Sequence, residues 1–269
     1  LGVTKGGEMQ VLGIDIGGSA TKGAIVDTET GLLVSERMRI AYKTIQEPAA
    51  IVKGINKIRK ELNYEGPIGV GFPGVVKHGQ IFTSANLHKD WIGKNLATMV
   101  TEKTGQPAVI LNDADAAGLA EMRFGAPELR QYDFVMFLTI GTGIGTALFV
   151  EGKLIPNTEL GHIEIHGKEA EHRASGAVKT REKLTWKQWA LRLNTVLLTY
   201  EALLNPEIFV LGGGISKDFE KYSKYLTTEA PVVAAKLQNL AGIIGAAIAA
   251  YETLKDKNEE AAFESQPLH

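Results

Sequence analysis

The sequence predicts an α/β protein with two lobes built on the same plan, and three observations carry this prediction. Short apolar runs of strand length alternate along the 269-residue chain with segments of helical periodicity. A strand, a glycine turn and a returning strand occupy residues 11–26. The same pattern occurs again at residues 134–150, about one domain length later, which indicates two lobes of common design.

The first half of the chain reads as three strands followed by alternating helices and strands. Residues 11–15 form an apolar strand that ends at a glycine pair, and residues 21–26 return from it. Residues 32–40 are expected to form the third strand. Residues 47–62 place apolar side chains three or four positions apart, as one face of a helix requires. The later elements expected here are a strand over 68–72, a hairpin, a helix, a strand over 108–111 and a helix over 114–124.

The second half repeats this opening and then becomes mainly helical. Strands are expected over 134–140 and 144–150, on either side of a glycine turn. The elements expected after residue 185 are a helix over 186–204, a strand over 208–211, a helix over 217–226 and a last helix over 241–254. The start of the last helix is rich in alanine and glycine, which permits close packing against another element.

Composition excludes several classes of protein. Lys and Arg number 29 against 31 Asp and Glu, so no overall basic field exists to coat nucleic acid or an anionic membrane. The absence of cysteine excludes disulfides, thiolate metal ligands and a cysteine nucleophile, and it fits a reducing cytoplasm. No run approaches the roughly 18 apolar residues of a membrane span. We therefore expect a cytoplasmic protein that is neither secreted nor inserted in a membrane.

Two glycine-rich turns carry the first chemical signal. Asp15 to Ser19 closes one strand pair, and Gly141 to Gly145 closes the other. Both place small residues and free backbone N–H groups where phosphate oxygens can approach, and Asp15 adds a carboxylate for a hydrated magnesium ion. Each turn alone is more often only a tight turn. Neither is a Walker loop or a Rossmann fingerprint, because no Gly-Lys-Ser/Thr follows and the next element is a strand.

A polar pair, Asn112 and Asp113, stands where an apolar strand ends and a helix begins. Asp113 in this place is most simply a helix N-cap. A carboxylate at the end of a sheet can also accept the proton of an attacking hydroxyl, as phosphoryl transfer requires. Taken alone, the pair leaves both interpretations open.

Glutamates and histidines gather after the second turn. Residues 159–166 read Glu-Leu-Gly-His-Ile-Glu-Ile-His, and residues 171–173 read Glu-His-Arg. Without cysteine and without a clear helical pair of histidine ligands, this segment does not favour a dedicated transition-metal site. Side chains that donate and accept hydrogen bonds suit the hydroxyls of a sugar better. His166 and His172 are expected to be exposed surface residues.

Taken in order, these motifs resemble those of the ROK sugar kinases, and within that family the polyphosphate-using glucokinases and glucomannokinases of actinobacteria. The resemblance covers nearly all of residues 10–254, and it implies that Asp113 is the catalytic base. The positions that match the family's sugar-binding residues are Asn86, Asn112, Asp113, Glu159, His162 and Glu171, together with Gly74. Those that match its phosphate and nucleotide motifs are Asp15, Gly17, Gly18, Ser19, Thr21, Lys22, Gly141, Thr142, Gly143, Gly213 and Gly214.

The same resemblance implies a fold and a reaction. The fold is a two-lobed ribonuclease-H-like fold of the actin-like ATPase superfamily, with the active site in the cleft between the lobes. Residues 1–112 with the C-terminal helix 241–256 form the smaller lobe, residues 113–240 form the larger, and residues 257–269 are a polar tail. The reaction makes hexose 6-phosphate from glucose, and from mannose as a further acceptor. The donor is inorganic polyphosphate, ATP or both, Mg²⁺ is held by Asp15 through water, and the enzyme is a homodimer.

One departure from the family concerns zinc. Most ROK proteins carry a cysteine-rich zinc loop between the Gly-His pair and the later glutamate, whereas this interval is short here and has no cysteine. The polyphosphate-using branch lacks the loop in the same way, so no zinc is expected.

Three rival functions remain at this point. A strictly ATP-dependent glucokinase of the same family is the nearest. A sugar-responsive repressor would need a helix-turn-helix ahead of the first strand, where only about ten residues stand. An actin-like filament or chaperone ATPase would have no reason for the Glu-Leu-Gly-His and Asn-Asp motifs.

Overall fold

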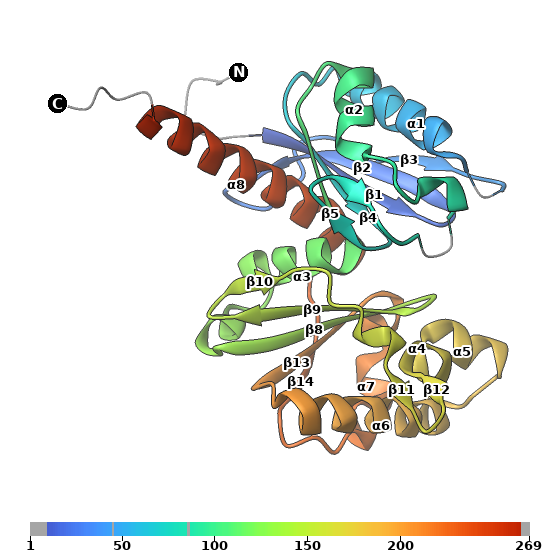
Figure 1. The fold of residues 1–269 in the computed structure, drawn as a ribbon. Helices are drawn as coiled ribbons and strands as arrows, with labels where there is room; N and C mark the ends of the chain where they lie inside the picture. Colours follow the sequence, from blue (N-terminus) through green and yellow to red (C-terminus); the bar gives the residue numbers. More distant parts are fainter. Residues whose placement is uncertain (1–9, 45, 85–86, 265–269) are drawn as a thin grey trace. The chain divides into compact units, whose positions relative to one another are not determined.

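The protein folds as two compact units of mixed α/β structure (Figure 1). The computed structural model describes residues 10–44, 46–84 and 87–264, with side chains as far as residue 260. Unit 1 comprises Leu1–Ala116 and Gly242–His269, and unit 2 comprises Ala117–Ala241. The chain therefore passes between the units twice, within helix α3 (Asp113–Phe124) and at the start of helix α8 (Ala241–Glu264).

The sheet of unit 1 has the strand order β3-β2-β1-β4-β7. The first three strands in sequence form an antiparallel meander, and β4 and β7 then add parallel to β1. The strands are β1 (Gln10–Gly17), β2 (Ala20–Asp27), β3 (Met38–Ala41), β4 (Ile68–Phe72) and β7 (Ala108–Asn112). The short elements of this unit are β5 (Val76–Lys77), β6 (Gln80–Ile81) and the 3₁₀ helix η1 (Lys89–Trp91).

Helices α1 (Pro48–Glu61) and α2 (Leu96–Thr104) cover one face of this sheet (Figure 1). Helix α1 begins at a proline, whose fixed φ suits a first helical turn. It buries Ile51, Ile55 and Ile58 at helical spacing, as the sequence predicted. These side chains and the inward residues of β1 and β4 form the core of unit 1.

Helix α8 lies directly on the opposite face of the sheet. Gly13 and Gly69 pair across β1 and β4, and both face away from α1 because side chains alternate along a strand. A Cβ atom at Gly13 would overlap the carbonyl oxygen of Ile243, and one at Gly69 would overlap that of Ala246. Glycine at these two places lets the helix backbone approach the sheet this closely.

The sheet of unit 2 repeats the plan of unit 1, with the order β10-β9-β8-β13-β14. Again three antiparallel strands come first, and two strands then add parallel to the first of them. The strands are β8 (Phe134–Ile140), β9 (Ile144–Val150), β10 (Lys153–Ile155), β13 (Ile208–Gly212) and β14 (Val232–Ala234). The shared order and direction confirm the prediction of two lobes of common design.

Helix α6 (Trp186–Leu204) supports the core of unit 2. A capping box of Thr185 and Gln188 begins it, and Asn205 in the left-handed conformation ends it. Its inner face buries Trp189 and Tyr200. The other helical elements are η2 (Pro127–Gln131), η3 (Leu160–His162), α4 (Ala170–Ala174), α5 (Gly176–Arg181), η4 (Gly214–Asp218), α7 (Phe219–Tyr222), η5 (Ser223–Tyr225) and η6 (Gln238–Leu240), and a hairpin joins β11 (Glu164–Ile165) to β12 (Lys168–Glu169).

Two elements differ from the prediction because side-chain contacts interrupt them. The expected third strand forms only over Met38–Ala41, because the hydroxyl of Ser35 accepts the N–H of Ile25 in place of a ladder bond. The expected helix 217–226 is broken into η4, α7 and η5. Fully buried Tyr222 stacks on Trp186 there, with ring centroids 5.7 Å apart, and this tertiary packing overrides local helix preference.

The last helix is longer than predicted and continues to Glu264. Residues 255–264 lack an apolar stripe, but most are good helix formers. Lys255 and Glu259 add an ion pair one turn apart, with Nζ and Oε1 separated by 3.9 Å. None of the helices in the described part of the chain combines the length and the apolar character that crossing a membrane requires.

Candidate active site

The first glycine turn joins β1 to β2 in unit 1. Gly17 ends β1, and Gly18 and Ser19 form an exposed tip before β2 begins. Thr21 is fully buried, and its hydroxyl pairs with that of Tyr42, so its side chain is not presented on the surface. The tip therefore offers main-chain N–H groups and one small hydroxyl to an approaching anion.

Asp15 stands at the base of this turn in a charged setting. Its Oδ2 accepts a hydrogen bond from Nζ of Lys22 at 2.9 Å, across the β1–β2 pair. The first turn of α8 lies beside the same carboxylate, because a Cβ atom at Gly242 would stand 3.3 Å from Cγ of Asp15. A helix N-terminus favours nearby negative charge, so this end of the sheet suits anions. About one fifth of the Asp15 side chain is exposed.

Asn112, rather than Asp113, caps helix α3. Oδ1 of Asn112 accepts the N–H groups of Ala114 at 2.8 Å and Asp115 at 3.1 Å. Its Nδ2 donates to the carbonyl oxygen of Gly74 at 3.1 Å, so the buried amide also ties the β4 loop to α3. Asp113 is then the first helical residue and is partly exposed. Because Asn112 supplies the cap, helix capping does not explain why an aspartate stands at position 113.

The second glycine turn, in unit 2, is joined to a predicted sugar ligand. Oε2 of Glu171 accepts the N–H of Ile144 at 3.3 Å and lies so close to Gly143 that a Cβ atom there would overlap it. The carbonyl oxygen of Gly141 accepts the N–H of Ala177 at the start of α5. Gly141 and the neighbouring Thr142 are exposed. Predicted sugar-binding and phosphate-binding groups thus meet within one unit.

Gly213 and Gly214 lie at the same edge of the sheet as this turn. They follow β13, which runs parallel to β8, and the carboxyl ends of neighbouring parallel strands meet at one edge. Gly213 has φ of 81°, and a Cβ atom there would lie 2.6 Å from the carbonyl oxygen of Ile140, the last residue of β8. A side chain at Gly213 is therefore strained and crowded.

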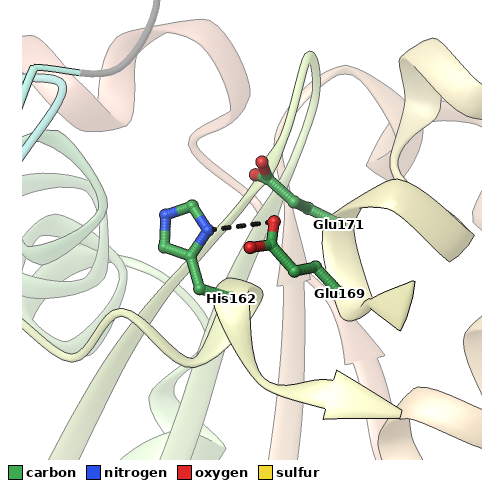
Figure 2. Close-up of side chains that lie close together, drawn as sticks. All are labelled: His162, Glu169 and Glu171. Carbon is green, nitrogen blue, oxygen red and sulfur yellow. Dashed lines mark hydrogen bonds and ion pairs between the residues drawn. The ribbon is translucent and has the colours of Figure 1, made fainter. Parts of the chain in front are cut away.

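A chain of glutamates and histidines follows the second turn. Nε2 of His162 lies 3.6 Å from Oε2 of Glu159. Its Nδ1 lies 3.4 Å from Oε2 of Glu169, and Figure 2 shows this second contact. The same Glu169 oxygen lies 3.2 Å from Nδ1 of His172, whose Nε2 lies 3.7 Å from Oε1 of Glu171. Burial raises the pKa of the Glu159 carboxyl, the charge of His162 opposes this rise, and Glu171 adds to it.

Glu169 was missed in the sequence, and His172 was correctly placed on the surface but without its ion-pair partners. Glu169 belongs to none of the predicted motifs, and the β11–β12 hairpin carries it back to His162. His172 is exposed, as predicted, but it takes part in the ion-pair chain. His166 lies at the exposed hairpin turn with φ of 48°, in agreement with a surface position. The signal for the hairpin was present in the alternating residues ahead of Gly167.

Three of these side chains have the spacing of a metal-binding group. His162, Glu169 and Glu171 offer one nitrogen and two oxygens that all lie within 4.8 Å of one another. Two of the three are predicted sugar ligands, so a metal and a sugar would compete for them. Asn86, the remaining predicted sugar ligand, lies outside the described residues.

Comparison with known proteins gives a consistent result. The family model of the ROK family matches residues 11–183. A polyphosphate glucokinase of Mycobacterium tuberculosis is 48% identical over 238 residues, which cover 88% of this chain and 89% of that protein. The structure of an inorganic polyphosphate/ATP-glucomannokinase from Arthrobacter sp. strain KM has a TM-score of 0.86 at 40% identity, covering 91% of this chain and 99% of that chain. A ROK family glucokinase of Streptomyces griseus, in complex with glucose and AMPPNP, has a similar fold with a TM-score of 0.77 at 24% identity, covering 91% of this chain and 100% of that chain.

Proposed function

Because this chain belongs to the ROK family, we propose that it transfers a phosphoryl group to the 6-hydroxyl of glucose, with mannose as a second acceptor. The donors are inorganic polyphosphate, which is in the names of the relatives from Mycobacterium and Arthrobacter, and ATP, which is in the name of the Arthrobacter protein alone. The observation that carries the proposal is the bond from Ile144 to Glu171, because it joins the predicted sugar-binding carboxylate to the predicted phosphate-binding turn. A strictly ATP-dependent glucokinase is the second candidate.

In the proposed mechanism, Asp113 orients the attacking hydroxyl and accepts its proton on a carboxylate oxygen. Glu159, His162 and Glu171 bind the other hydroxyls of the hexose, because they combine donors and acceptors within one cluster. The main-chain N–H groups of the two glycine turns bind phosphate oxygens and stabilise the charge that develops during transfer.

Asp15 is proposed to hold Mg²⁺ through water. Its carboxylate is a hard oxygen donor, it is partly exposed, and Lys22 engages only Oδ2, so the residues present fit the ion. When bound, magnesium supplies positive charge that offsets the charge on the phosphates. We further propose a homodimer that acts in the cytoplasm and binds neither nucleic acid nor membranes, and light scattering of the purified protein tests its oligomeric state.

The direct test is a panel of sugars against ATP and polyphosphate, with the product identified by ³¹P NMR. Hexose 6-phosphate should form from glucose and from mannose with either donor. ATP hydrolysis at the same rate with and without sugar would instead indicate an actin-like ATPase. Product from ATP alone would leave the second candidate as the correct function.

The use of polyphosphate should depend more strongly on salt than the use of ATP. Nζ of Lys179 lies 4.0 Å from the ring centroid of Trp186, and that of Lys221 lies 5.6 Å from it, so two cations share one indole. A polyanion held by such cations is screened by salt, whereas ATP is held partly by its adenosine. From low to high salt, the KM for polyphosphate should rise about tenfold more than the KM for ATP.

The variant Lys179→Ala should raise the KM for polyphosphate and leave that for ATP nearly unchanged. Lys187→Ala, an exposed lysine of α6, is the matched control and should change neither. Equal salt dependence for the two donors, or equal effects of the two variants, would contradict this picture. Two other basic residues are already paired, Lys22 with Asp15 and Arg181 with Glu182.

The enzyme should also work without zinc. No thiolate ligand is available, and His162 is then able to contact the sugar. Metal analysis of protein purified without a His-tag should find less than one zinc per chain, and a chelator should not reduce glucose binding. Stoichiometric zinc that disappears in His162→Ala would show that the cluster around Glu169 is a metal site instead.

A further inference from the structure

Glu169 links the two histidines of the site through a single oxygen atom. Its Oε2 lies 3.4 Å from Nδ1 of His162 and 3.2 Å from Nδ1 of His172. The opposite ring nitrogens face the carboxylates of Glu159 and Glu171, at 3.6 Å and 3.7 Å. Glu169 is therefore the central member of a chain whose two ends are the proposed sugar-binding carboxylates.

The backbone that carries Glu169 is held in place independently of this chain of side chains. Glu169 pairs with Glu164 across the β11–β12 hairpin. The next residue, Ala170, donates its N–H to the carbonyl oxygen of Ile163 at 2.9 Å and begins helix α4. Nη1 of Arg173 donates to the carbonyl oxygen of Ile165 at 3.1 Å, which ties α4 to the hairpin. The carboxylate thus projects from a supported frame toward His162 (Figure 2).

The chemistry of this contact decides which nitrogen of His162 is available to a substrate. An ionised carboxylate only accepts hydrogen bonds, so an imidazole nitrogen that is hydrogen-bonded to it must carry the proton. A partner on one ring nitrogen sets the protonation and the orientation of the other. The contact of Nδ1 with Glu169 at 3.4 Å is a hydrogen bond, whereas Nε2 lies 3.6 Å from Oε2 of Glu159, which is too far for one. Nε2 is therefore the nitrogen left for a ligand on the Glu159 side.

We propose that Glu169 is a positioning residue for hexose binding. It accepts Nδ1–H of His162 so that Nε2 contacts a sugar hydroxyl, and its charge attracts His172, which lies beside Glu171. This inference rests on the proposed sugar kinase function. Glu169 itself need not touch the sugar, and its removal should affect the binding of hexose rather than the use of the phosphoryl donor.

The kinetic test compares Glu169→Ala and Glu169→Gln with Glu164→Ala. Glu164 is the exposed cross-strand neighbour of Glu169 in the same hairpin, so its variant controls for loss of a carboxylate from this element. Both Glu169 variants should raise the KM for glucose about 10- to 100-fold, the usual cost of removing an orienting partner. Their kcat and their KM for either donor should change less than about threefold. Glu169→Asp should recover part of the loss, and Glu164→Ala should behave as the unchanged enzyme.

A spectroscopic readout separates positioning from a general loss of structure. In ¹⁵N NMR of the unchanged protein, Nδ1 of His162 should be protonated, and in Glu169→Gln the population should move toward the Nε2–H form. The Gln variant keeps the size of the side chain, so its melting temperature should stay close to that of the unchanged protein. An unaltered KM for glucose and an unaltered tautomer in a folded variant would overturn the proposal. The proposal would also be overturned if Nδ1 of His162 carried no proton in the unchanged protein, which is the state expected of a nitrogen that binds a metal.

Failure of the underlying function can be told apart from failure of this inference. A protein that phosphorylates no sugar would refute the kinase proposal, yet the NMR measurement would still report whether Glu169 sets the tautomer of His162. A protein that phosphorylates glucose normally in the Glu169 variants would refute only the positioning role.

Discussion

Replacing Asp113 by asparagine should lower kcat by a factor of about 10² to 10⁴, the usual scale for loss of a general base. Asparagine has nearly the same shape but accepts a proton poorly, so the hydroxyl is still bound and is no longer activated. Glucose affinity, measured by calorimetry, should therefore stay within about threefold of the original value. The same loss should appear with ATP and with polyphosphate, because the base acts on the acceptor.

Stability measurements separate this chemical role from a structural one. The helix cap belongs to Asn112, so Asp113→Asn should leave the melting temperature nearly unchanged. Asn112→Ala, in contrast, removes the cap and the bond to Gly74, and should cost about 1–3 kcal/mol of the free energy of unfolding. Near-normal turnover in a folded Asp113→Asn enzyme would rule out the proposed mechanism.

Replacing Gly69 by alanine should prevent stable folding of unit 1. The new Cβ atom would overlap the carbonyl oxygen of Ala246 and approach further backbone atoms of α8. A shift of either backbone would cost much free energy, because β4 lies between two other strands of the sheet and α8 packs along it. We expect a loss above roughly 4 kcal/mol, a large part of the about 5–15 kcal/mol that stabilises a typical protein. Urea unfolding followed by circular dichroism measures the loss.

Gly54→Ala provides the matched control for this prediction. Gly54 is also buried in unit 1, but a Cβ atom there meets only Ile40 and Tyr42 at 3.5 and 3.6 Å, which is ordinary contact. Because alanine is the better helix former, this change within α1 should be neutral or stabilising by up to about 1 kcal/mol. If Gly69→Ala and Gly54→Ala unfold at the same urea concentration, α8 does not approach the sheet as closely as described here.

Elements with strong local signals were predictable to the residue. β4, β8, β9 and α6 have the bounds expected from apolar runs, glycine turns and helical spacing. The breaks in the helix expected over 217–226 could not be predicted, because they depend on the packing of Tyr222 against Trp186 of another helix. In the sequence, the glycines of β1 and β4 indicate weakened strands, because glycine has no side chain to pack. Only the contact with α8 explains why they are there.

The candidate site shows the same division between local motif and tertiary partner. Asp15, Asp113 and Glu171 could be named from motifs, because each motif is continuous in sequence. Their partners could not be named in this way. The bond from Ile144 to Glu171 joins residues 27 positions apart, and the contact of Glu169 with His162 needs the hairpin between them. Which member of the Asn112–Asp113 pair caps α3 depends on side-chain geometry that residue types leave open.

The discontinuity of unit 1 has a consequence for how the protein is made on the ribosome. Its sheet is complete once β7 emerges, but α8, which covers the glycine face of β1 and β4, is synthesised about 130 residues later. At about 5–20 residues per second this delay is roughly 6 to 26 s. Unit 2 is a continuous segment, so it can finish folding while that face of unit 1 is still bare. A nascent chain arrested just before α8 should therefore carry a folded unit 2 and a unit 1 sheet whose glycine face is exposed to solvent. Such a chain is the form most in need of a chaperone.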